Sequence, residues 1–355
     1  MKYSRLQAGV LGILLVQNAS YTLMRRYSIG VRRDSFSSQE CLALAEVFKL
    51  VLSLYKIHKD GDWRKGGTDF GKYIRGLLMD SSKMLALAWI YALMNVLSFV
   101  SLARIDASTF TIVAQLKILT TGLFSYAVLG KTFSTVKKIA LCNLVCGAVL
   151  VTAPSLSGGG GRGARNAEGG GGGGGGAEYF VGLVAVAVEV TLSGFASIYF
   201  EKVVKGVGQG NAPLLGIFER NVQLAVHSLP FYMVMIVYNG GGSVGVLGGW
   251  NMYGVLLSFL GGGGGILVAL SVKHADSVLK TLATSGSIVV ATLLGHYLLG
   301  GPLNAVMLVG IAVVILAIFL YSFDPTPAAA PPPTKTAGRG GDVEAVPFIE
   351  KRVDS

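Results

Sequence analysis

The sequence predicts an all-α polytopic membrane protein with ten membrane-spanning helices. Of its 355 residues, 52% are hydrophobic and only 14% are charged, whereas a soluble domain carries about 25% charged residues. Apolar segments of roughly 17–25 residues, the length that crosses a bilayer as a helix, recur along most of the chain. Their residues lack the alternating pattern of a membrane β-barrel, which leaves helices. This composition excludes a soluble Rossmann enzyme, a nucleic-acid-binding domain and a secreted disulfide scaffold.

The apolar segments follow one another from near the N-terminus to residue 322. The first comes directly after MKYSRLQ, and because it has full membrane-crossing length we expect it to insert by itself, without a cleavable signal peptide. Ten such helices need roughly 210 residues, which this chain can supply. In chain order, the predicted spans are 6–24, 38–57, 83–103, 108–130, 136–153, 178–200, 213–238, 249–272, 277–299 and 303–322.

A glycine-rich segment separates the ten spans into two sets of five. It reads SGGGGRGARNAEGGGGGGGGAEY at 157–179, and glycine at this density behaves as a flexible coil. It lacks the Lys-Ser/Thr ending of a phosphate-binding loop. We predict a first five-helix half at 1–153, a flexible linker at 154–177, a second half at 178–322 and a disordered polar tail at 323–355. A short turn and a helix follow both Leu129-Gly130 and Leu299-Gly300, which is a weak hint of duplication.

The basic residues are distributed unevenly between the two sides of the predicted bundle. The chain holds 30 Lys and Arg against 19 Asp and Glu, a net charge of +11. If both termini are cytosolic, the cytosolic segments hold 19 of the basic residues and the opposite segments hold seven. Because cytosolic loops of membrane proteins carry the excess of Lys and Arg, we expect cytosolic termini. We accordingly expect the lipid bilayer, and not nucleic acid, as the partner of these charges.

Lys117 is the clearest candidate for a functional charge inside the membrane. It lies nine residues into the fourth predicted span, where a charged side chain costs about 2.5–3.5 kcal/mol. No charged residue lies one helical turn away along the sequence, and Gln115 offers a hydrogen-bonding amide nearby. Two interpretations stay open: Lys117 binds an anionic ligand, or it pairs with an acid on another helix, such as Glu189 or Glu46.

A second lysine, Lys280, lies in the ninth predicted span, with Asp276 four residues before it. This spacing also allows a helix-end salt bridge, which is the alternative to ligand binding. Glu46 and Lys49 are three residues apart in the second span, and we interpret them as a structural pair. If Lys117 and Lys280 face one cavity, they suit an organic anion with about two negative charges. From the residues alone, the chain is an organic-anion carrier without a metal or other cofactor.

Several segments of the chain form a recognisable series. The longest is IDASTFTIVAQLKILTTGLFS at 105–125. The others are LVQNAS at 15–20, AEVFKL at 45–50, GFASIYFEKVVK at 194–205, ERNVQLA at 219–225 and VKHADSVLKTLATSGSI at 272–288. In this order they resemble the nucleotide-sugar transporters of the Golgi apparatus and endoplasmic reticulum, over residues 8–322. The 105–125 segment is close to that family's fourth-span signature and is the most specific match.

The resemblance implies a drug/metabolite-transporter fold in which two five-helix halves are inverted relative to each other. It implies a transporter and not an enzyme, one that exchanges a cytosolic nucleotide sugar for a lumenal nucleoside monophosphate by alternating access. The two lysines would hold the phosphates, two asparagines would contact nucleotide or sugar, and one tyrosine matches a family position. The candidate substrate-binding residues are Lys117, Lys280, Asn95, Asn221, Tyr199 and Gln115.

We therefore expect an antiporter of UDP-galactose or UDP-N-acetylglucosamine against UMP, in the Golgi membrane or, as second choice, that of the endoplasmic reticulum. The chain departs from the family at Met94, Phe110 and Ala114; CMP-sialic acid carriers have Tyr at the Phe110 position, which favours uridine. A CMP-sialic acid exchanger, an organic-anion metabolite exporter of the same fold and assembly into a homo-oligomer stay open. A membrane-embedded sugar transferase is disfavoured because no loop carries the paired carboxylates that it needs.

Overall fold

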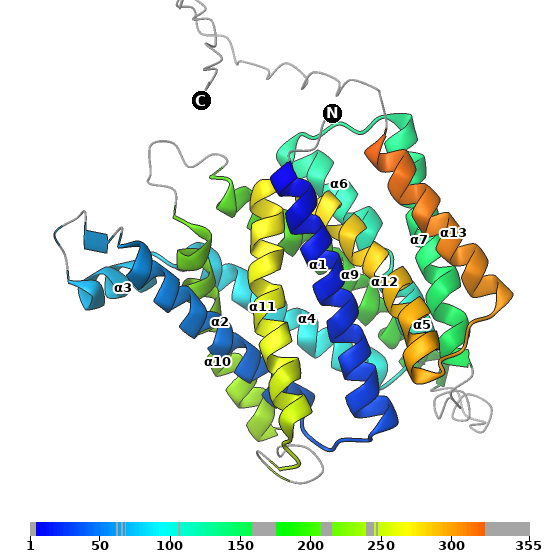
Figure 1. Ribbon diagram of the computed structural model, residues 1–355, viewed down its shortest axis with the longest axis horizontal. Helices are drawn as coiled ribbons and strands as arrows, with labels where there is room; N and C mark the ends of the chain where they lie inside the picture. The colour runs from blue at the N-terminus through cyan, green and yellow to red at the C-terminus, as the bar shows by residue number, and fades with distance from the viewer. Residues whose placement is uncertain are drawn as a thin grey trace, which may run out of the picture.

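The computed structural model describes residues 5–61, 63–64, 67, 69–105, 107–157, 175–206, 215–238, 245 and 248–323, and these form helices without any strand. The long helices lie side by side in one bundle (Figure 1). In that view, α1 (Arg5–Arg25) begins at the same end of the bundle at which α13 (Ala305–Ser322) ends. The prediction of an all-α polytopic membrane protein is confirmed. Most of the predicted linker, 158–174, and the tail from 324 onward lie outside the described residues.

Each predicted span coincides with a helix or with a pair of consecutive helices. Eight of the described segments are long and apolar enough to cross a membrane. The helices at the first two predicted spans, α1 and α2, are not among these eight; polar residues interrupt α1 and charged residues interrupt α2. Besides α1 and α13, the long helices are α2 (Ser38–Asp60), α4 (Ser82–Leu102), α7 (Thr135–Ser157), α9 (Gly175–Val204), α10 (Ile217–Tyr238), α11 (Met252–His274) and α12 (Ser277–Leu299).

The fourth predicted span is not one continuous helix. It is divided into α5 (Ala107–Ala114) and α6 (Lys117–Leu129) by a turn at Gln115 and Leu116. At the turn, Ile118 N donates to Gln115 O at 3.1 Å and Leu119 N to Leu116 O at 3.0 Å. These bonds span three residues instead of four, which tightens the backbone locally. The predicted span at 108–130 matches a membrane-crossing segment at Thr109–Leu129, and the turn inside it makes Lys117 the first residue of α6.

A short helix, α3 (Phe70–Met79), lies between α2 and α4 where the sequence analysis expects only a loop. The carboxylate of Asp69 accepts a hydrogen bond from Gly71 N at 3.0 Å and caps its N-terminus. Its apolar face packs through buried Leu77 against Ile57 and Val222. An aspartate cap followed by apolar residues at helical spacing was the available signal. A π-helical segment, η1 (Arg26–Val31), also extends α1.

The long helices pack in pairs that correspond between the two sets of five. Helix α4 packs on α9 as α1 packs on α11, and α6 packs on α9 as α1 packs on α12. Helix α2 contacts both α10 and α11, and α4 also contacts α10. The fifth helix of each set, α7 and α13, lie side by side (Figure 1). If each helix of one set is replaced by the helix at the same position in the other set, these packed pairs change into one another or stay the same. The pairs named here therefore follow a two-fold correspondence between the two sets.

Two helix ends repeat one local structure. Helix α6 ends at Gly130 and α12 ends at Gly300, both in the left-handed region with φ of 65° and 61°. Each glycine N–H bonds to a carbonyl of the preceding turn, and Lys131 N and Gly301 N bond one residue further back, as in a Schellman motif. In both cases the next helix begins five residues after the glycine. The resemblance of the Leu-Gly turns in sequence thus extends to their backbone geometry.

Candidate functional site

A polar cavity of about 340 Å³ lies among α1, α6, α9, α11 and α12. Its walls consist mainly of hydroxyl, amide and ammonium groups, and none of the lining residues in the described part of the chain is acidic. The lining residues are Asn18, Thr22, Gln115, Lys117, Thr121, Ser193, Ser197, Val268, Lys280, Thr281, Thr284, Ser285, Ser287 and Ile288. Three of the six predicted site residues, Lys117, Lys280 and Gln115, are therefore brought together here.

Lys117 enters the cavity from the start of α6. Its side chain is exposed, and it is exposed to the cavity that it lines. Glu189 on α9 lies close enough to interact with its charge, but the described residues offer it no ion pair. The other proposed acid, Glu46, binds Lys49 at 2.6 Å. The predicted Glu46–Lys49 pair is thus confirmed, and a pairing of Lys117 with Glu46 is wrong.

Lys280 lies in the first turn of α12 and is directed toward α9. Its Nζ donates a hydrogen bond to Ser197 Oγ at 3.1 Å. Asp276 precedes the helix and caps it, accepting from Leu279 N at 2.7 Å, and its other oxygen lies 3.3 Å from Lys131 Nζ. The alternative of an Asp276–Lys280 salt bridge is therefore wrong, because a capping residue in extended conformation does not share a helix face with the residue four positions later.

The cavity's hydroxyl groups were not singled out from the sequence. Ser193 and Ser197 are four residues apart and share one face of α9, while Thr281 and Thr284 lie on the cavity face of α12. Asn18 joins them from α1, and its amide nitrogen has no hydrogen-bond partner among the described residues although it is buried. The available signal was helical spacing of Ser and Thr within apolar spans. Such spacing alone does not distinguish a cavity from a helix contact.

The remaining predicted site residues, Asn95, Asn221 and Tyr199, do not line this cavity. Asn221 is buried on α10, and the structure gives its Nδ2 no hydrogen-bond partner within the described ranges. Tyr199 packs on Phe195, with 5.9 Å between the ring centroids. Asn95 is half-buried on α4 and lies near the Tyr232 side chain. Their contacts with a ligand stay predictions.

Two of the departures from the family pattern also lie away from the cavity. Phe110 packs against the cluster that contains buried Val186 and Val190. Met94 packs against the apolar cluster that includes Leu87 and Phe200. In this conformation Phe110 does not line the cavity, so its lack of a hydroxyl group gives no support for a choice of base.

Beyond Lys280, a network around Glu201 ties helices together. The Glu201 side chain is fully buried and accepts hydrogen bonds from Lys131 Nζ at 2.7 Å and Lys205 Nζ at 2.9 Å. Its other oxygen accepts from Ser277 N at 2.9 Å, and Ser277 Oγ donates to Ser197 O at 2.9 Å. The chain segment after α6, the end of α9 and the start of α12 are thereby held together next to the cavity.

Known proteins resemble this chain over most of its length. The sequence pattern that defines the family described as nucleotide-sugar transporter matches residues 2–322. The chain belongs to this family. It is 33% identical to the UDP-N-acetylglucosamine transporter of Rattus norvegicus over 329 residues, which cover 90% of this chain and 96% of that protein. It is 32% identical to the UDP-galactose translocator of Bos taurus over 378 residues, covering 99% and 91%.

Membership of the nucleotide-sugar transporter family identifies the chain as a membrane transporter of nucleotide sugars and not as an enzyme. A solved structure with the same fold superposes with a TM-score of 0.61 at 17% identity, covering 90% of this chain and 98% of that one. The residues that line the cavity all fall within 2–322, the part of the chain that the family pattern matches.

Proposed function

We propose that this chain is a nucleotide-sugar antiporter that exchanges a cytosolic UDP-sugar for lumenal UMP. The observation that carries the proposal is the cavity in which Lys117 and Lys280 both lie without a carboxylate among its described lining residues. Two unneutralised ammonium groups inside a membrane are costly unless an anion joins them. The names of its relatives, transporters of UDP-N-acetylglucosamine and UDP-galactose, support a diphosphate-linked sugar as that anion.

The chemistry of the cavity suits both ligands of such an exchange. A UDP-sugar carries about two negative charges, and UMP carries nearly as many near neutral pH. Either ligand would neutralise the two lysines, so the loaded carrier can change conformation, whereas in the empty carrier neither lysine has an ion-pair partner among the described residues. The hydroxyls of Ser193 and Thr284 can bind ribose or sugar hydroxyls. Obligatory exchange then follows from charge compensation and needs no ATP.

Alternating access is supported by the correspondence between the two sets of five helices. The packing pairs exchange with one another, and the turns at Gly130 and Gly300 share one geometry. We interpret these as two inverted halves that rock against each other around the cavity. The Glu201 network holds the end of α9 to the start of α12 beside the cavity, and we expect it to open when the carrier turns to that side.

The orientation and location follow from the same proposal. The Glu201 network contains Lys131, on the segment between α6 and α7, which the distribution of basic residues assigns to the cytosol. Both termini would then be cytosolic as well. A carrier that delivers nucleotide sugars for lumenal glycosylation belongs in the Golgi membrane, with the endoplasmic reticulum as the second choice.

Counterflow in liposomes tests the proposal. Purified protein is reconstituted into liposomes loaded with UMP, CMP, GMP or buffer, and initial uptake of labelled UDP-galactose, UDP-N-acetylglucosamine and CMP-sialic acid is compared. We expect UMP to stimulate uptake of a UDP-sugar most strongly, by about tenfold over CMP, because a base-specific pocket leaves polar groups unpaired against the wrong base. Stronger exchange of CMP-sialic acid against CMP would change the assigned substrate but not the assigned site. Stimulation by none of the nucleotides would favour an organic-anion exporter and contradict the proposal.

A further inference from the structure

A second cavity lies on the outside of the bundle, in a groove between α6 and α7. It has a volume of about 400 Å³, within the range of small-molecule sites. Apolar side chains form most of its walls, among them Leu119, Leu123, Phe133 and Leu141. The groove lies over Gly122, where a Cβ atom would come within 3.2 Å of Leu141 Cδ1, so the missing side chain keeps the space open. The cavity shares none of its described lining residues with the polar cavity.

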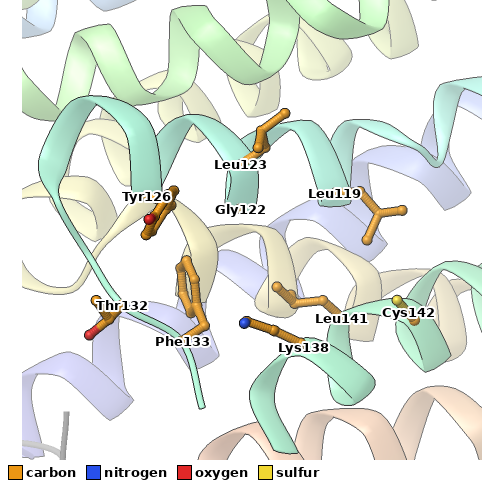
Figure 2. A pocket seen from close by; sticks show the side chains of 9 residues that line it. All are labelled: Leu119, Gly122, Leu123, Tyr126, Thr132, Phe133, Lys138, Leu141 and Cys142. Carbon is orange, nitrogen blue, oxygen red and sulfur yellow. The ribbon is translucent and has the colours of Figure 1, made fainter. Parts of the chain in front are cut away.

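The groove opens toward the lipid bilayer. Leu123 and Tyr126 line it and are 63% and 60% exposed, and both α6 and α7 belong to membrane-crossing segments. Figure 2 shows Thr132, Tyr126 and Phe133 toward one end of the groove, with Leu119 and Cys142 toward the other. From Tyr126 to Leu119 the α6 wall extends about 10 Å at 1.5 Å per residue. A smooth lipid-facing surface is ordinary, whereas a hollow of this length accommodates part of one acyl chain.

A lysine without a partner among the described residues lines this groove. Three lysines lie around the start of α7: Lys131 binds Glu201 at 2.7 Å, and Lys137 lies 5.6 Å above the ring of Tyr321. The third, Lys138, lines the groove, and its ammonium group meets no acid or hydrogen-bond acceptor in the described part of the chain. Its nitrogen points between Phe133 and Leu141 in Figure 2.

We propose that this groove binds one anionic phospholipid, with an acyl chain along α6 and the headgroup phosphate at Lys138. Lys138 belongs to the first turn of α7, the depth at which a lysine reaches lipid phosphates. Burying an acyl chain gives no hydrophobic gain in exchange for other lipid tails. Selectivity therefore comes from the headgroup charge, and the site prefers phosphatidylserine to phosphatidylcholine.

Native mass spectrometry of the full-length protein tests this preference. Detergent-solubilised protein is titrated with phosphatidylserine and phosphatidylcholine, and the lipids retained per chain are counted. We expect Lys138→Gln to weaken phosphatidylserine binding about fivefold, since one basic residue at the headgroup level contributes about 1 kcal/mol. The matched control is Lys137→Gln, on the neighbouring residue that contacts Tyr321, and it should leave the preference unchanged. Equal retention of both lipids by the wild type, or the same loss in both variants, would overturn the proposal.

A second measurement locates the lipid. Cys142 lines the groove and Cys146 lies one turn further along α7; both are exposed. Two variants, Cys146→Ala and Cys142→Ala, each leave one of them for modification by a membrane-permeant maleimide. Added phosphatidylserine should slow modification of Cys142 at least fivefold and leave Cys146 unaffected. Equal rates with and without lipid would contradict the site. Protection of Cys142 that accompanies a dimer mass without bound lipid would assign the groove to a second copy of this chain, and would also contradict it.

Discussion

Lys131 Nζ lies 2.7 Å from Oε1 of Glu201, a carboxylate with no exposed surface. Lys131 follows α6 directly after Gly130, whereas Glu201 belongs to the last turn of α9. The same lysine also reaches Asp276 at the start of α12. The pair therefore joins the two lysine-bearing helices, α6 and α12, through α9. Any movement of these helices that opens the cavity on this side must separate charges that are paired in the structure.

Replacement of the buried acid tests the strength of this connection. We expect Glu201→Gln to destabilise the protein by about 3 kcal/mol or more, because removing one partner of a buried ion pair leaves the other charges uncompensated. The control is Lys56→Gln, whose partner Asp60 and whose own side chain are exposed, and such a pair contributes about 1 kcal/mol or less. Thermal unfolding in one detergent compares them. Equal shifts in melting temperature would mean that the Glu201 network is not structural.

The hydrogen bond from Lys280 to Ser197 orients the lysine in the cavity. We expect Ser197→Ala to raise the apparent KM for the nucleotide sugar about fivefold, since a single hydrogen bond contributes about 1 kcal/mol, while thermal stability stays unchanged. Ser271→Ala is the control: Ser271 is buried on α11 and bonds only the carbonyl of Val268 in its own helix among the described residues. Initial uptake measured over a series of nucleotide-sugar concentrations gives the apparent KM of each variant. A KM that is the same in both variants would remove Ser197 from the site.

The contact between α7 and α13 depends on glycine. A Cβ atom at Gly310 would lie 2.8 Å from both Leu150 Cβ and Val151 N, and a backbone atom cannot move aside cheaply. We expect Gly310→Ala to destabilise the protein by about 1–3 kcal/mol through overpacking. Gly12→Ala on α1, where nothing lies within 4 Å of the added atom, should be neutral or stabilising. The melting temperatures of the two variants are compared with that of the wild type. An unchanged melting temperature for Gly310→Ala would show that α7 and α13 can move apart to accept the added methyl group.

We expect that the glycine-rich segment can be shortened without loss of transport. Deleting residues 169–174 removes six glycines and leaves the helix ends at Ser157 and Gly175 intact. Loop-closure entropy changes by only a few tenths of a kcal/mol for such a change in length. Counterflow rates at equal protein amounts should stay within about a factor of two. A severalfold lower rate for the shortened protein would show that these residues take part in transport.

The sequence was sufficient to predict the eight membrane-crossing segments and to place Lys117 and Lys280 inside two of them, because both predictions depend on local composition. Twenty apolar residues predict a membrane helix wherever they occur, and a lysine among them stands out. The break before Lys117 was missed because Gln115 and Leu116 are ordinary helix formers. What makes this turn part of the site is the position of α6 beside α9 and α12, which no local pattern contains.

Partners that are distant in the chain explain which other contacts the sequence could not predict. Asp276 lies four residues from Lys280, and spacing favoured that pair, yet the folded chain gives it Lys131 instead. Likewise, Phe110 was interpreted from its place in a motif, whereas its side chain packs beside Val186. Hydroxyl groups such as Ser197 carried no signal until the structure placed them opposite a lysine.

Uptake by Lys117→Ala tests the central claim, that the lysines of one cavity hold the anionic ligand. Removing the charge should favour insertion of the helix into the membrane, so the variant should be produced in normal amounts and bind no UMP. In UMP-loaded liposomes with equal amounts of protein, we expect labelled UDP-sugar uptake at the level of empty liposomes. Lys117→Arg should also fail, since a planar guanidinium does not replace a compact ammonium group, whereas Lys56→Gln should transport normally. Uptake by Lys117→Ala near that of the wild type would contradict the account.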